Sequence, residues 1–175
     1  MSMMSDIEIL RLQPGQKRQQ IYPLLYAQLK ALFEGENNRI ANLANAASLL
    51  YFGCGFWWVG FYLVDETTRQ LVLGPFHGPV ACTRIPWGSG VCGTAWKRRE
   101  HIVVPDVNAF EGHIACSSAS RSEWVGCIVG GKEPHAPVVA VLDIDSVILA
   151  DFDETDQQEL GRIVELISGL WPSWT

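Results

Sequence analysis

The chain has 175 residues, of which 48% are hydrophobic and 18% charged, and its formal net charge is −6. This length and composition predict one compact domain with a substantial core, and they exclude a disordered chain. The acidic balance also argues against nucleic-acid or anionic-membrane partners, because either would require a basic face.

The N-terminal sequence "MSMMSDIEIL" has neither the basic nor the apolar segment of a secretory signal. Five cysteines form an odd number without a paired framework, which favours a reducing compartment, and we expect the cytoplasm. Residues 40–64 carry no charge and are long enough to span a bilayer. However, polar Asn42 and Asn45 recur on one side and "GCG" breaks the run, so we expect a soluble helix, turn and strand.

Helical patterns occupy both ends of the chain and one short internal segment. We expect helices over residues 16–34, 38–52 and 91–99, and a last helix that begins at "FDETDQQE". In this last segment Asp153 or Thr155 is the expected N-cap, and Gln158 would complete a capping box. The N-terminal residues 1–15 and the tail 171–175 are expected to flank a single domain, 16–170.

Strand-like runs fill the middle of the chain, separated by turn residues as in an antiparallel sheet. The runs are "FWWVGFYLV", "QLVLGPF", "HIVVPDV", "WVGCIVG" and "PVVAVLDID". Residues 108–123 show neither helical nor strand periodicity, and so long a loop in a compact domain is usually functional or disordered. The combination predicts an α+β fold.

The stretch "GSGVCG", residues 88–93, matches the glycine pattern of dinucleotide-binding loops. Such a loop follows a buried parallel strand, but here Pro86 and Arg84 precede it and no βαβ alternation surrounds it. A nucleotide site is therefore not expected. Glycines that open a helix would still lower the pKa of Cys92 and stabilise its thiolate. The alternative is a tight turn with a small packed cysteine.

The five cysteines divide by their surroundings. Cys82, Cys92 and Cys116 lie in polar or glycine-rich segments and are candidate nucleophiles, whereas Cys54 and Cys127 lie in apolar runs and are expected to be structural. The chain lacks the paired Cys and His spacings of a zinc site, so no metal is expected.

Two carboxylates and two aromatic residues are placed for ligand binding. Asp143 and Asp145 alternate with apolar residues, so in a strand they share a face, and mutual repulsion would raise a pKa and create a general acid. The alternative is a solvent-facing strand end. Trp58 and Tyr62 share a face across Gly60, and we expect an aromatic wall with a gap for a small ligand.

Three segments, "ACTRIPWGSGVCGTA", "VPDVNAFEGHIACSSAS" and "VAVLDIDS", with "WVGFY" upstream, resemble the free methionine-(R)-sulfoxide reductases. The resemblance runs from about residue 37 to 168. It implies a GAF domain: an antiparallel sheet of about six strands, helices on one face and a loop-covered ligand cavity on the other.

The resemblance also implies roles for individual residues. Cys116 corresponds to the cysteine that attacks the sulfoxide sulfur, Cys82 to the resolving cysteine, and Cys92 to a third thiol that can join the exchange. The carboxylates that hold and activate the substrate correspond to Glu123, Asp143 and Asp145, and the aromatic residues beside its methyl end to Trp58 and Tyr62.

By the same resemblance, the substrate would be the R epimer of the free amino acid. A thioredoxin-like protein would restore the thiols, and no cofactor would be needed. Homodimerisation through the N-terminal helices is plausible for such a domain. Two other functions stay open: a ligand-binding GAF sensor without catalysis, and a thiol-based oxidant sensor.

Overall fold

The computed structural model describes residues 11, 16–112 and 118–175. The helices are α1 (Tyr22–Phe33), α2 (Arg39–Cys54), α3 (Gly90–Arg98) and α4 (Glu154–Leu170), with 3-10 turns η1 (Arg18–Gln20), η2 (Val107–Ala109) and η3 (Trp171–Ser173). The strands are β1 (Trp58–Asp65), β2 (Gln70–His77), β3 (Arg84–Pro86), β4 (Ile102–Val104), β5 (Ser122–Val129) and β6 (Val138–Ser146).

The strands form one six-stranded sheet in the order β3-β2-β1-β6-β5-β4, and every neighbouring pair is antiparallel. The five predicted strands are confirmed within two to three residues at their ends. Strand β3 was not expected from the sequence because it contains Pro86. It occupies an edge of the sheet, where the N–H group that proline lacks is not needed for a hydrogen bond to a further strand.

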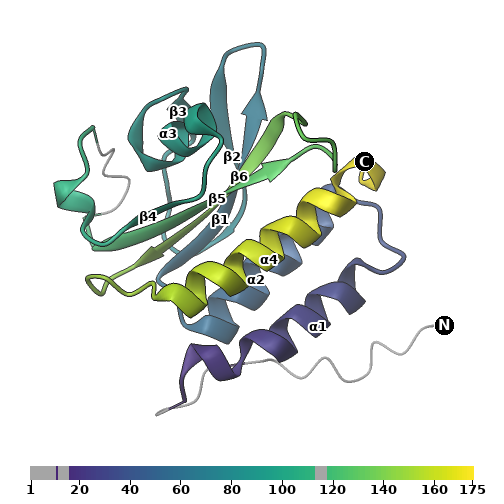
Figure 1. Ribbon diagram of the computed structural model, residues 1–175, viewed down its shortest axis with the longest axis horizontal. Helices are drawn as coiled ribbons and strands as arrows, with labels where there is room; N and C mark the ends of the chain where they lie inside the picture. Colours follow the sequence, from purple (N-terminus) through teal and green to yellow (C-terminus); the bar gives the residue numbers. More distant parts are fainter. Residues whose placement is uncertain (1–10, 12–15, 113–117) are drawn as a thin grey trace.

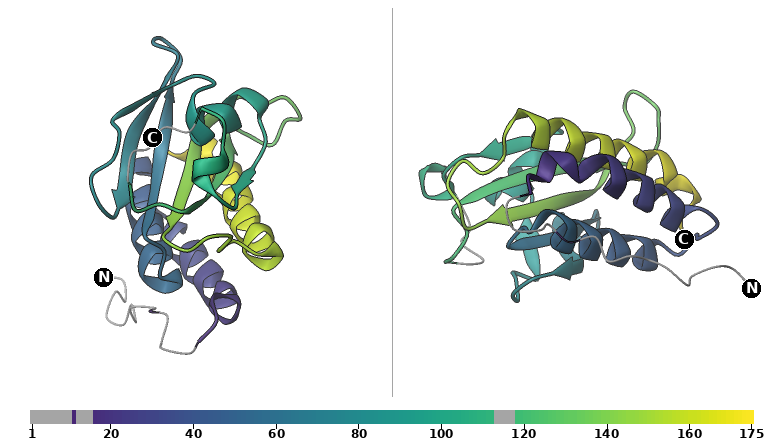
Figure 2. Two further views of the ribbon diagram at one scale, coloured as in Figure 1. Left: turned by 90° about the vertical axis from the view of Figure 1, so that its left-hand side faces the viewer. Right: turned by 90° about the horizontal axis from the view of Figure 1, so that it is seen from below.

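Helices α2 and α4 pack on one face of the sheet, α1 packs against these helices on the side away from the sheet, and the short α3 lies over the other face (Figures 1 and 2). The strands alternate accordingly: Val59 and Phe61 of β1 join the core beneath the large helices, while Trp58 and Tyr62 join a second cluster with α3. Both faces of β1 are therefore buried, one under the large helices and the other under α3 and the loops beside it.

The helix ends follow local sequence signals. Helix α2 begins after Asn38, whose side chain accepts a hydrogen bond from the Ala41 N–H at 2.9 Å, and it ends at Gly55 in the left-handed conformation. Asp153 is the N-cap of α4, as expected, but Asp156 completes the capping box. The expectation for Gln158 is wrong. Gln158 would complete a capping box only with Thr155 as the N-cap, whereas the third residue after Asp153 is Asp156.

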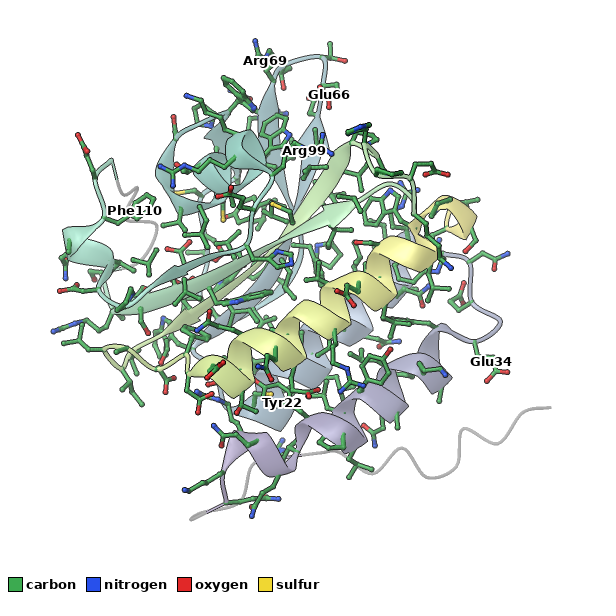
Figure 3. All side chains as sticks on the ribbon, in the orientation of Figure 1. Tyr22, Glu34, Glu66, Arg69, Arg99 and Phe110 are labelled. Atoms are coloured by element: carbon green, nitrogen blue, oxygen red, sulfur yellow. The ribbon has the colours of Figure 1, made fainter. Side chains whose placement is uncertain are left out.

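A buried polar cluster attaches η1 and α1 to the start of α4. Arg18 donates to both Asp151 and Asp156, and the Tyr22 hydroxyl donates to Asp156 Oδ1 at 2.8 Å. Figure 3 shows Tyr22 pointing from α1 into the helical layer. At the other end of the layer Trp174 is 3% exposed and packs edge-on against Phe33, so the last residues belong to the core.

Within the described parts of the chain, no helix is long and apolar enough to cross a membrane.

Candidate functional site

A cavity of about 40 Å³ lies on the face of the sheet that α3 covers. Three carboxyl groups, a thiol, a hydroxyl and two aromatic rings converge on it from β1, β5, β6, the start of α3 and two loops. Its described walls are Trp58, Tyr62, Pro79, Val80, Ala81, Ile85, Gly90, Val91, Cys92, Ser120, Glu123, Asp143 and Asp145. All the predicted site residues except two line this cavity. Cys82 is the neighbour of Ala81 in the wall, and Cys116 lies outside the described residues.

The strand register brings the three carboxyl groups together. Glu123 of β5 is the cross-strand partner of Asp145 on β6, and Asp143 follows two residues away on the same face. Glu123 is 6% exposed and Asp143 is 7% exposed. The alternative of a solvent-facing strand end is therefore wrong, because the loops and α3 cover this part of the sheet.

Burial and mutual repulsion keep these groups protonated to unusually high pH. Burial, followed by repulsion from Asp145, raises the pKa of Asp143 well above its ordinary value. Burial and the nearby Asp143 do the same to the pKa of Glu123. The pKa of Asp145 rises to about 6, again through burial, although a hydrogen bond from the Ser120 hydroxyl opposes the rise. The expected raised pKa in the Asp143–Asp145 pair is confirmed.

Cys92 lies in the first turn of α3, with its Sγ 4.0 Å from Glu123 Oε1. The expectation of a lowered pKa is wrong. Burial raises the pKa of the thiol, and the negative charges of Asp143 and Glu123 raise it further. The partial charge at a helix N-terminus is small beside full carboxylate charges in a water-poor cavity. Cys92 is thus a protonated, buried thiol.

The two aromatic residues hold a loop over the cavity. Trp58 and Tyr62 stack with ring centroids 6.1 Å apart. The Trp58 indole N–H donates to the Pro79 carbonyl at 2.9 Å, and the Tyr62 hydroxyl donates to the Cys82 carbonyl at 3.0 Å. The predicted gap over Gly60 is filled, because a side chain there would collide with the Trp58 ring. The aromatic pair therefore forms a closed wall that fixes the 79–82 loop.

The remaining cysteines differ as the sequence predicted. Cys54 and Cys127 are buried free thiols, and Cys127 donates to the carbonyls of Ala95 and Glu100 at 3.3 Å, which is a packing role. Cys82 is half-buried and disulfide-bonded. Sequence reasoning missed Ser120, whose hydroxyl contacts Asp145. The only signal for it was its place in the aperiodic loop 108–123.

Comparisons with known proteins agree with this geometry. No family model matches the chain. "GAF domain-containing protein A" of Dictyostelium discoideum is 50% identical over 94% of this chain and 99% of its own length. The free methionine-R-sulfoxide reductase of Escherichia coli K12 is 44% identical over 83% of this chain and 85% of its own. The structure of free methionine-R-sulfoxide reductase from Neisseria meningitidis, in complex with its substrate, superposes with a TM-score of 0.86 at 43% identity, covering 94% and 95% of the two chains.

The six-stranded antiparallel sheet with its helical layer and opposite cavity is the GAF fold. Within that class, the chain is similar to these three proteins over most of its length. The identities of 43–50% are well above the level at which similarity indicates a fold alone. The chain belongs to the free methionine-R-sulfoxide reductase family.

Proposed function

We propose that this chain reduces free L-methionine (R)-S-oxide to L-methionine by oxidising its own thiols. The observation that carries the proposal is the cluster of Glu123, Asp143 and Asp145 in the cavity wall of a chain of this family. Three carboxyl groups suit the ammonium group of a free amino acid. A carboxyl group with a pKa of about 6, as at Asp145, holds a proton in part of the molecules near neutrality and can donate it.

In the proposed first step, the thiolate of Cys116 attacks the sulfoxide sulfur while a protonated carboxyl group donates to the sulfoxide oxygen. When this adduct collapses, the new sulfur–sulfur bond and the substrate's sulfur–oxygen bond break and a sulfur–oxygen bond forms on Cys116. Methionine leaves reduced by two electrons, and Cys116 remains as a sulfenic acid. Trp58 and Tyr62 would contact the methyl end of the substrate, since their rings form the apolar part of the wall.

In the second step, the thiol of Cys82 condenses with the sulfenic acid to form a disulfide and release water. Two observations favour Cys82 over Cys92 as the resolving thiol. The pKa of Cys92 is raised by burial and by the carboxyl groups around it, which disfavours its thiolate. Cys82 is disulfide-bonded in this structure and its carbonyl is fixed by Tyr62.

A thioredoxin-like protein would then reduce the disulfide by exchange. A cytoplasmic location is part of the same proposal and rests on the cysteine content of the sequence. A homodimer formed through the N-terminal helices rests on the resemblance alone. The division into residues 1–15, 16–170 and 171–175 is likewise a proposal, although Trp171 and Trp174 of the last segment pack in the core.

The test is methionine release from each sulfur epimer of free L-methionine sulfoxide, with a thioredoxin system as donor. Turnover of the R epimer alone is expected. If neither epimer is turned over, with a small dithiol also failing, the ligand-binding sensor becomes the better assignment. Disulfide formation by peroxide without methionine release would favour the oxidant sensor.

Three variants separate the thiol roles. Cys116→Ser should abolish turnover, and full turnover by this variant would contradict the mechanism. Cys82→Ser should release about one methionine per chain when a protein dithiol is the only reductant, because the sulfenic acid then has no resolving partner. Cys127→Ser is the matched control and should turn over normally, since its thiol donates to the carbonyls of Ala95 and Glu100 and is not among the described residues that line the cavity.

A further inference from the structure

The proposed reaction gives Glu123 and Asp143 a role in substrate binding, but it does not explain why the thiol of Cys92 lies among them. Cys92 Sγ and one carboxylate oxygen each of Glu123 and Asp143 lie within 4.8 Å of one another. The three residues come from α3, β5 and β6, and each is buried. The sequence predicted no metal because spacing motifs find only ligands that lie close together in the chain. These three residues are far apart in the chain and come together only in the folded domain.

A second observation points to a missing partner at this position. Asp143 is 7% exposed, lines the cavity, and its Oδ1 accepts no hydrogen bond from any residue in the described ranges. Buried polar atoms in proteins are almost always paired, and an unpaired carboxylate oxygen is particularly costly. A ligand that offers positive charge to Asp143 would remove this cost.

We propose that Cys92, Glu123 and Asp143 form a binding site for a zinc-class divalent cation. One sulfur and two carboxylate oxygens suit Zn²⁺ or Co²⁺, whereas Mg²⁺ and Ca²⁺ take oxygen ligands almost exclusively. In a tetrahedral zinc site with bonds of about 2.3 Å to sulfur and about 2.0 Å to oxygen, the two donors lie about 3.5 Å apart. The Cys92 Sγ–Glu123 Oε1 distance of 4.0 Å therefore requires only a small contraction.

The cation would occupy the wall to which the substrate is proposed to bind. Three protein ligands leave one coordination position open toward the cavity, and the charge of the ion would cancel the repulsion among the carboxyl groups. Bound metal should thus exclude the ammonium group of the amino acid and inhibit the enzyme. The inhibition rests on the proposed reductase function, whereas metal binding does not.

The first experiment is a Co²⁺ titration of the form in which Cys82 is disulfide-bonded, followed by absorbance. In this form the free thiols among the described residues are Cys54, Cys92 and Cys127. We expect one equivalent of Co²⁺ to produce a sulfur-to-cobalt charge-transfer band in the near ultraviolet. Zn²⁺ should abolish the band by displacement, and excess Mg²⁺ should leave it unchanged.

The variants assign the ligands. Cys92→Ser should lose the band, while Cys127→Ser, a matched buried thiol at the same α3–β5 contact, should retain it. Glu123→Gln and Asp143→Asn should keep the band but weaken Co²⁺ binding about tenfold or more. These two variants also keep the test decisive if Cys92→Ser fails to fold, because unchanged affinity in both would overturn the site.

Two other results would overturn the proposal: no band in the wild-type chain at millimolar Co²⁺, or an unchanged band in folded Cys92→Ser. Inhibition is tested separately by methionine release in a single turnover of the reduced chain, metal-free and with one equivalent of Zn²⁺, without added thiol because small dithiols bind zinc. Zn²⁺ should suppress the release, and equal release with and without Zn²⁺ would overturn the inhibition. Normal release by the metal-free chain without a cobalt band would refute the metal site alone, whereas a cobalt band without release by the metal-free chain would refute the reductase.

Discussion

Asp145 carries its negative charge where burial disfavours it, so the neutral variant Asp145→Asn should stabilise the domain at neutral pH. Its pKa rises from 3.8 to about 6 in the folded protein, mainly through burial. A raised carboxyl pKa means that the folded state holds the proton more tightly than the unfolded state. Stability therefore falls as the pH increases from about 3.8 to about 6, and it stays at the lower level above that range.

The magnitude follows from the pKa difference. A rise of about 2.2, at 1.36 kcal/mol for each pKa unit, corresponds to about 3 kcal/mol of lost stability above pH 6. At pH 4 the carboxyl group is protonated in the folded state and partly so in the unfolded state, and only a small part of this penalty remains. The amide oxygen of asparagine can still accept the hydrogen bond from Ser120, so the substitution removes the charge with little change in shape.

The assay is urea unfolding of wild type and Asp145→Asn at pH 4 and pH 7.5, with the disulfide state kept the same. The variant should gain about 3 kcal/mol at pH 7.5 and little at pH 4. Glu111→Gln, which changes an exposed carboxyl group, should stay within about 0.5 kcal/mol of wild type at both pH values. An equal effect of Asp145→Asn at both pH values, or a loss of stability at pH 7.5, would refute the reasoning.

Three further predictions concern the framework of the site. Tyr22→Phe removes the buried hydroxyl that donates to Asp156 and should cost about 1 kcal/mol in urea unfolding; an unchanged midpoint would show that this hydrogen bond contributes nothing. Gly60→Ala places a methyl group against the Trp58 ring and should cost about 1–3 kcal/mol and shift the tryptophan fluorescence. Wild-type stability and emission would mean that the ring moves freely. Asp153→Ala removes the capping box of α4 and should cost about 1 kcal/mol in thermal unfolding followed by circular dichroism, with a Tm equal to wild type as the contrary result.

Local features of the chain were predicted from sequence because local interactions determine them. The alternation in "FWWVGFYLV" placed Trp58 and Tyr62 on one face of β1, and the same period placed Asp143 and Asp145 together on β6. The helix N-cap was also predicted from local sequence. Asp153 precedes α4 because its side chain accepts a hydrogen bond from a backbone N–H group only three residues away. The buried positions of Cys54 and Cys127 also follow from the apolar runs that contain them.

The chemistry of the site was decided by tertiary structure. A helix N-terminus beside Cys92 predicted a low pKa, yet the fold buries that thiol against Glu123 and Asp143, and the pKa rises. The pairing of Glu123 with Asp145, the contact of Ser120, and the edge position of Pro86 likewise depend on the order of strands in the sheet. Electrostatic energies vary with the distance and the water between groups, and for residues far apart in the chain the fold alone sets both.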